Sequence, residues 1–242
     1  MHHHDEEAML LIQMNNHATW LIQFGHYTEA YYQLRRTMEL EEMNGRSFGS
    51  DYCGHRVEVL VRVGRATLSS VAHTVDGTMF SSPLVITFDT TTPTRKDISY
   101  PMGIRTNDSA NLQRQHTVCA TALYNMGLAC HLRLQRHSLS SSQQRHLQRT
   151  VQVFYQQALD ICQTLPLSIL QLAICNNLLQ LTMVEQEDWD VGCFWYNIFC
   201  RLLDQGDLTF ATMTGSSEGL WKHFLQVKAY YSTTNPYAAG AA

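Results

Sequence analysis

A helical hairpin near the N-terminus places the strongest constraint on how this chain can fold. Apolar residues recur at helical spacing on both sides of Gly25, and that glycine allows a tight turn between the two stretches. Ala18 and Ala30, one on each side of the turn, would let the two backbones approach closely. One such hairpin cannot bury its own apolar faces, so further copies are expected to stack on it.

Two later segments repeat this pattern. The second copy pairs residues 122–131 with an apolar stripe that runs from Val151 to Ile161. About a dozen extra residues separate its two helices, and they lengthen either the turn or the flanking helices. The third copy runs from Leu172 to Leu203. The sequence therefore predicts about three helical hairpins.

The first hairpin resembles a tetratricopeptide (TPR) repeat in its small residues, its Gly-x-Tyr-x-x-Ala run from Gly25 to Ala30 and its trailing Leu/small/Leu positions. In the third copy, Trp189 and Gly192 stand at the positions of the turn tyrosine and the close-packing alanine. The resemblance implies a mostly all-α fold, a right-handed array of about three TPR-like hairpins. The order of hairpin, insertion and hairpins also resembles a group of uncharacterised repeat proteins of marine unicellular algae.

A long insertion between the first and second hairpins has a residue pattern that does not fit a helical hairpin. Valines alternate with other residues over 56–63, and a second apolar run covers 84–88, which predicts two candidate strands. Asp76-Gly77 between them is a turn signal. We expect a small two-stranded β ribbon that leans on the flanking helices. The insertion is either a recognition element or a decoration, because loops of this length are uncommon in compact domains.

These patterns divide the chain into four parts: the first hairpin at 8–43, the irregular insertion at 44–108, the second and third hairpins at 109–204, and a C-terminal extension at 205–242. We expect the last ten residues to be disordered. An apolar face within the extension would cap the open end of the array. Its predicted residues are Leu220, Trp221, Phe224 and Leu225.

Composition and charge exclude several classes of partner. Charged residues make up 16% of the chain and the net charge is −4, which argues against a nucleic-acid surface. No run approaches the ~18 consecutive apolar residues of a spanning helix, and no basic-then-apolar leader opens the chain. We therefore expect an intracellular, cytoplasmic protein that binds neither nucleic acid nor membrane. The seven cysteines are predicted to be reduced core residues rather than metal ligands.

Catalytic motifs are not apparent. The run Gly45–Gly49 has the letters of a nucleophile elbow around Ser47, but it follows an acidic helix end and lacks the flanking strand and helix. The glycine is better explained as a helix terminator. The sequence therefore predicts no enzyme, no catalytic residue, no metal and no cofactor.

The TPR resemblance implies that the first helices of the hairpins line a concave surface for an extended or helical peptide. Amide and aromatic side chains dominate this surface, and amides can bracket a peptide backbone because they both donate and accept hydrogen bonds. The cations of a carboxylate-clamp TPR domain are missing at the matching positions. The predicted partner-binding residues are Asn15, Thr19, Gln23, Tyr124, Leu128, His131, Asn176 and Gln180, with Ile22 and Thr121 on the same surface.

Two functions stay open from the sequence. The first is a non-catalytic scaffold that binds a protein or peptide partner through this groove. The second is a structural or self-associating protein, a homo-oligomer that uses exposed apolar ends of the array. Neighbouring asparagines, Asn16, Asn125 and Asn177, have a simpler interpretation as hydrogen-bond links between adjacent helices.

Overall fold

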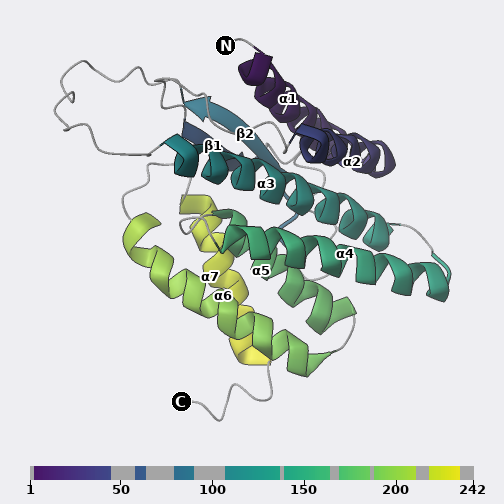
Figure 1. Cartoon of the computed structure of the whole chain (residues 1–242). Helices are drawn as coiled ribbons and strands as arrows, with labels where there is room; N and C mark the ends of the chain where they lie inside the picture. Colours follow the sequence, from purple (N-terminus) through teal and green to yellow (C-terminus); the bar gives the residue numbers. More distant parts are fainter. Residues whose placement is uncertain are drawn as a thin grey trace. The chain divides into compact units, whose positions relative to one another are not determined.

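A computed structural model of the chain describes residues 3–44, 58–63, 79–89, 107–136, 139–163, 169–185, 188–210 and 218–234 (Figure 1). Over these residues the protein is mostly helical, which confirms the mostly all-α part of the fold class predicted from the sequence. The chain divides into two compact units, one comprising Met1–Thr67 with Ser82–Pro166, the other Leu68–Ser81 with Leu167–Ala242. Within the described ranges, no helix combines the length and apolar character needed to cross a membrane.

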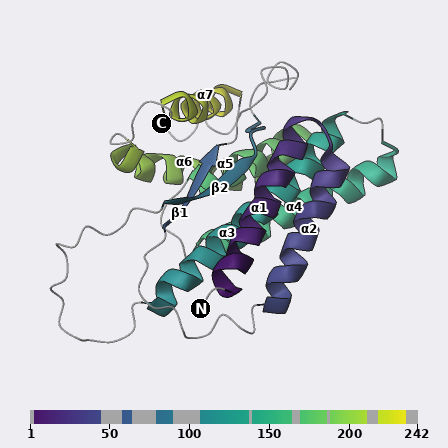
Figure 2. The same cartoon turned by 90° about the horizontal axis from the view of Figure 1, so that it is seen from above.

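The first unit contains two helical hairpins. Helices α1 (His3–Gln23) and α2 (Tyr27–Asn44) form one, and α3 (Asn107–Arg136) and α4 (Ser141–Cys162) form the other. Helix α2 packs against α3, so the hairpins lie side by side (Figure 2). Their bounds extend a few residues beyond the predicted 8–43 and begin slightly before the predicted 109.

The turn between α1 and α2 depends on Gly25, the residue that the sequence places there. Its φ of +83° is a left-handed conformation that glycine adopts without strain. The Gly25 N–H donates to the Ile22 carbonyl at 3.1 Å, and the His26 N–H donates to the Leu21 carbonyl at 2.9 Å. These two bonds form a Schellman motif, which satisfies carbonyls at the end of α1.

The extra residues of the second hairpin lengthen its helices. Helix α3 has 30 residues and α4 has 22, and a short connection joins them. Helix α4 starts at a capping box, in which the Gln143 N–H donates to Ser140 Oγ and the Ser140 N–H donates to Gln143 Oε1. Of the two alternatives left by the sequence, long helices are the one that the structure adopts.

A β ribbon completes the described part of the first unit. Strand β1 (Glu58–Val63) pairs with β2 (Leu84–Asp89) in antiparallel register, with Val61 opposite Ile86. The sequence placed candidate strands at 56–63 and 84–88. Strand β2 contacts both α1 and α3, so part of the insertion lies against the first helices of both hairpins (Figure 2).

The second unit contains α5 (Ile169–Gln180), a π-helical turn η1 (Leu181–Glu185), α6 (Trp189–Phe210) and α7 (Glu218–Thr234). Helix α5 packs on α6, and α7 packs on both. Helix α6 continues past residue 204, where the sequence ended the third hairpin.

The predicted capping face on α7 is wrong at Leu225, whose side chain is 46% exposed. Phe224, Val227 and Tyr231 are buried instead. These three follow the helical period and form one face, whereas Leu225 lies a further 100° around the helix. Of the last ten residues, which the sequence predicts to be disordered, Thr233 and Thr234 belong to α7, and the other eight lie outside the described residues.

Two glycines allow close packing against neighbouring side chains. A Cβ at Gly127 of α3 would lie 2.7 Å from Cε1 of the buried Tyr155 ring on α4. A Cβ at Gly192 of α6 would lie against Cγ of the buried Met183 side chain, closer than to its Cε at 2.9 Å. A packed side chain must therefore move at both sites, because Cγ lies next to the Met183 backbone and is not the flexible end of that side chain.

These close contacts predict that alanine is destabilising at both positions. Both alanine variants gain up to about 1 kcal/mol of helix propensity. We expect Gly127→Ala and Gly192→Ala each to lower the free energy of unfolding by roughly 1–2 kcal/mol, because the cost of overpacking exceeds that gain. Urea denaturation measures both, and a neutral or stabilising effect at either position would contradict this account.

Candidate functional site: main-chain clamps on an extended segment

Asparagine side chains on the helices hold the main chain of the insertion between residues 79 and 89, which we call the held segment. The contacts fall in both units, with residues 82–89 held in the first and Phe80 in the second. We use the term asparagine clamp where Oδ1 accepts from the N–H and Nδ2 donates to the carbonyl of the same residue.

The first clamp is formed by Asn125 of α3, which is fully buried. Its Oδ1 accepts from the Leu84 N–H at 2.9 Å, and its Nδ2 donates to the Leu84 carbonyl at 2.8 Å. Asn15 of α1 joins this clamp, because its Nδ2 donates to the same carbonyl at 3.3 Å and its Oδ1 accepts from Asn125 Nδ2 at 3.0 Å. The Leu84 main chain thereby links α1 to α3.

The second clamp is formed by Asn16 of α1. Its Oδ1 accepts from the Ile86 N–H at 2.9 Å, and its Nδ2 donates to the Ile86 carbonyl at 2.8 Å. The Asn16 side chain is only partly buried. Neighbouring residues of α1 therefore hold two positions of one strand, Asn15 through Leu84 and Asn16 through Ile86.

The spacing of the clamped residues follows from strand geometry. In an extended strand the N–H and carbonyl of one residue point to the same edge, and alternate residues share that edge. Leu84 and Ile86 therefore direct their polar groups to the asparagines, whereas Val85 and Thr87 direct theirs to β1. The asparagine amides occupy the place that a third strand would take.

Apolar side chains of the same stretch enter the core of the first unit. Leu84 and Ile86 are buried, and Ile86 belongs to a cluster with Leu11, Ile12 and Val118. The Tyr124 hydroxyl of α3 donates to the Ser82 carbonyl at 3.0 Å. The strand is thus held by its backbone through polar contacts and by its side chains through burial.

The second unit contains the third clamp, on α5. Asn177 Oδ1 accepts from the Phe80 N–H at 2.9 Å, and its Nδ2 donates to the Phe80 carbonyl at 3.1 Å. Asn176 Nδ2 donates to Asn177 Oδ1 at 3.2 Å. The Phe80 ring is buried and lies 5.4 Å, between ring centroids, from Phe224 of α7.

The predicted site residues are only partly brought together. Asn15 and Tyr124 contact the held segment, as described above. Thr19 and Thr121 instead donate to the carbonyls of Asn16 and Thr117 in their own helices, both at 2.7 Å. The protons of these two hydroxyls are therefore used within their own helices.

Most of the remaining predicted residues are buried. His131 Nδ1 lies 3.4 Å from the Tyr155 hydroxyl, and Leu128 and Asn176 are fully buried. Gln180 is buried, and its Oε1 has no hydrogen-bond partner among the described residues. Gln23 is partly exposed. None of these four buried residues presents an open surface in this structure.

The clamps were missed because each of the three asparagines had a simpler explanation as a link between helices. Asn16 and Asn177 make two-point bonds to the insertion, which that explanation does not include. It is partly right for Asn125, which also bonds to Asn15. The available signal was the recurrence of asparagine in the first helix of every hairpin.

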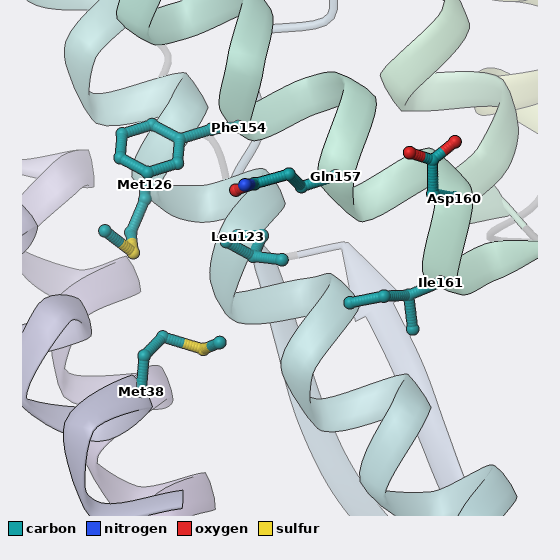
Figure 3. A pocket seen from close by; sticks show the side chains of 7 residues that line it. All are labelled: Met38, Leu123, Met126, Phe154, Gln157, Asp160 and Ile161. Carbon is teal, nitrogen blue, oxygen red and sulfur yellow. The ribbon is translucent and has the colours of Figure 1, made fainter. Parts of the chain in front are cut away.

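A pocket of about 500 Å³ lies between α2, α3 and α4 of the first unit (Figure 3). Five of its side chains are apolar, and Gln157 and Asp160 supply its polar groups. Asp160 is the one acidic group among these lining residues. The pocket therefore lacks the paired titratable groups that acid–base catalysis needs.

Two buried thiols in the helices are held in their neutral forms. Burial raises the pKa of the Cys130 and Cys162 thiols to about 12, so neither is a reactive thiolate. The six cysteines in the described part of the chain form no disulfide bond with one another, and Cys53 lies outside it, as does Ser47. No three His, Cys, Asp or Glu side chains in that part gather closely enough to hold a metal ion.

Burial lowers the pKa of His223 below its usual value. Its ring lies 5.8 Å from Phe80, and its Nε2 has no hydrogen-bond partner among the described residues. The unfolded chain takes up the proton near pH 6.5, before the folded protein does. Stability from the neutral ring is therefore present above about pH 6.5 and is lost as the pH falls below it.

We expect wild type to lose more stability between pH 7.5 and pH 5.5 than His223→Phe, which keeps the aromatic contacts and cannot be protonated. Urea midpoints at the two pH values measure the difference. Equal losses in the two proteins would show that His223 does not carry this dependence.

Comparisons of the chain with protein-family models, with curated proteins and with solved structures found no match. Its class therefore follows from its own fold and site. It is a mostly helical protein in which asparagines of α1, α3 and α5 bind the main chain of an extended segment.

Proposed function

We propose that this protein is a non-catalytic scaffold in which TPR-like hairpins bind an extended segment of a protein partner. The observation that carries the proposal is the clamp itself, which occurs on the first helix of each hairpin. Asn16, Asn125 and Asn177 each bond to the N–H and the carbonyl of one residue. Such two-point contacts recognise an extended backbone whatever its side chains are.

In the proposed site, different groups supply affinity and specificity. The clamps supply hydrogen bonds that any extended chain can make, as in recognition by strand addition. The neighbouring apolar sites, such as that of Ile86 beside Leu11 and Val118, then select among sequences. The proposed scaffold is a right-handed array with the first helices on its concave side, and its partner is a protein or peptide.

The test is selection of displayed random peptides on the immobilised full-length protein. We expect a sequence consensus on wild type and on Gln13→Ala, an exposed position one turn from the clamp on α1. Enrichment of peptides with this consensus should fall at least tenfold on Asn16→Ala. The Asn16 side chain is only partly buried, so its loss should leave the fold intact. Identical selection on wild type, Gln13→Ala and Asn16→Ala would show that the asparagine does not hold the peptides and would contradict the proposal.

Self-association is the second candidate, because an exposed aromatic pair lies at the end of α1 and in the turn that follows it. Trp20 is 50% exposed and Phe24 is 57% exposed, with their ring centroids 4.6 Å apart. Exposed apolar surface of this kind is typical of protein contacts. The candidate predicts a mass that rises with concentration in sedimentation and that Trp20→Ser with Phe24→Ser returns to the monomer. A monomeric mass at all concentrations would exclude it.

A further inference from the structure

The polar half of the site is not specific for the sequence that occupies it. All six clamp hydrogen bonds end on main-chain atoms of Phe80, Leu84 and Ile86. Main-chain groups are the same in every extended segment without proline at a clamped position. The clamps would therefore hold another segment as well as they hold this one.

The apolar half of the site does discriminate. The side chains of the three clamped residues are all buried, with Phe80 against Phe224, and Ile86 against Leu11 and Val118. Pro83 lies between clamped positions, where its missing N–H leaves no clamp unsatisfied. Ser81 and Ser82 are partly exposed and impose little selection. In the first unit, the occupant thus defines the pattern Leu-x-Ile, which the Asn125 and Asn16 clamps fit.

We propose that residues 84–86 are a displaceable internal ligand of the two clamps in the first unit, and that the external ligand of these clamps is an extended segment of another protein with the pattern Leu-x-Ile. The inference rests on the proposed function and adds the partner's chemistry and its regulation. While the chain's own residues fill the clamps, an external segment binds only to the fraction of molecules in which they are released.

The covalent connection makes the internal segment a strong competitor. Residues 45–78 join it to α2 and residues 90–106 join it to α3, so it stays near its site. Tethered segments of this kind compete at effective concentrations of order millimolar. Weakening the side-chain contacts of the internal copy should therefore raise the apparent affinity for an external copy without any change in the clamps.

The experiment measures binding of a fluorescent peptide with the sequence of residues 78–90 to the full-length protein. We expect the variant Phe80→Ser/Ile86→Ser to bind at least tenfold more tightly than wild type, by fluorescence anisotropy. Adding Asn16→Ala to that variant should remove most of the gain, whereas adding Gln13→Ala should not. A scrambled peptide should not bind to any of them.

A second measurement on wild type covers the case in which the double variant fails to fold. With excess peptide, hydrogen exchange at the protein's own Leu84 and Ile86 amides should accelerate at least tenfold, because displaced residues lose the clamps. The α3 and α4 amides should keep their protection. Unchanged exchange at Leu84 and Ile86 under saturating peptide would overturn the inference.

The outcomes separate this inference from the proposed function. Equal binding of the peptide to wild type and to Phe80→Ser/Ile86→Ser would mean that the internal segment does not compete, which overturns the inference and leaves the function standing. Asparagine-dependent selection of random peptides without binding of the 78–90 peptide would do the same. A doubled mass of wild type that Phe80→Ser/Ile86→Ser abolishes would assign the occupant to a second copy and overturn the external partner.

Discussion

Replacing Asn125 with alanine is expected to lower the free energy of unfolding by roughly 3–5 kcal/mol, because two buried groups lose their hydrogen-bond partners. The Leu84 N–H loses its acceptor, and Asn15 Oδ1 loses its donor. The Leu84 carbonyl keeps the bond from Asn15 Nδ2. Each unsatisfied buried group costs about 1–3 kcal/mol, and the vacated side-chain volume adds to this. Urea denaturation followed by circular dichroism measures the effect.

Two matched variants control this prediction. Asn16→Ala removes an equivalent clamp from a partly exposed position, where water can replace the lost bonds, so we expect a cost of about 1 kcal/mol. Gln13→Ala, at an exposed position of the same helix, should change stability by less than about 0.5 kcal/mol. If Asn125→Ala were as mild as Gln13→Ala, the clamp would have no energetic role in the folded protein.

Tyr155→Ala should cost about 3–5 kcal/mol, because it removes a fully buried aromatic ring between α3 and α4. The ring centroid lies 6.0 Å from that of Tyr124 and 5.9 Å from that of His131. The glycine at position 127 leaves room for it, so no neighbouring Cβ can fill the cavity. The measurement is again the free energy of unfolding in urea.

Val153→Ala is the control for Tyr155→Ala, since Val153 lies on the same helix and is 47% exposed. It should cost less than about 1 kcal/mol. Tyr155→Phe separates the ring from the hydroxyl, and should cost about 1 kcal/mol for the contact with His131 Nδ1. A cost for Tyr155→Ala close to that of Val153→Ala would mean that the two helices repack without the ring.

Local signals predicted the helical elements and the first turn, because their causes lie within a few residues. The left-handed glycine at position 25 and the apolar stripes around it are visible in the sequence alone. The extra residues of the second hairpin are also visible in the sequence, but the choice between a long turn and long helices needed the structure. The face of α7 was misassigned because adjacent Phe224 and Leu225 are both apolar, and only packing distinguishes them.

The clamps could not be predicted because they join residues that are far apart in the chain. Asn16 and Ile86 are 70 positions apart, and Asn177 and Phe80 are 97 apart. A side-chain bond to main-chain atoms places no demand on the residue it binds, so the insertion carries no matching signal. Of the predicted residues, Asn15 and Tyr124 bond to the insertion, whereas Thr19 and Thr121 bond within their own helices. Partner binding by the predicted residues stays a prediction.

The position of β2 between β1 and the asparagines bears on how the chain avoids aggregation. A strand at the edge of a sheet offers unpaired N–H and carbonyl groups to any other extended chain, and natural proteins protect such edges. In β2 the ladder to β1 covers one edge, and the amides of Asn16 and Asn125 cap the other at Leu84 and Ile86. Side chains thus cover this edge, as closure covers the strand edges of a barrel. A strand released from the asparagines would again expose unpaired N–H and carbonyl groups.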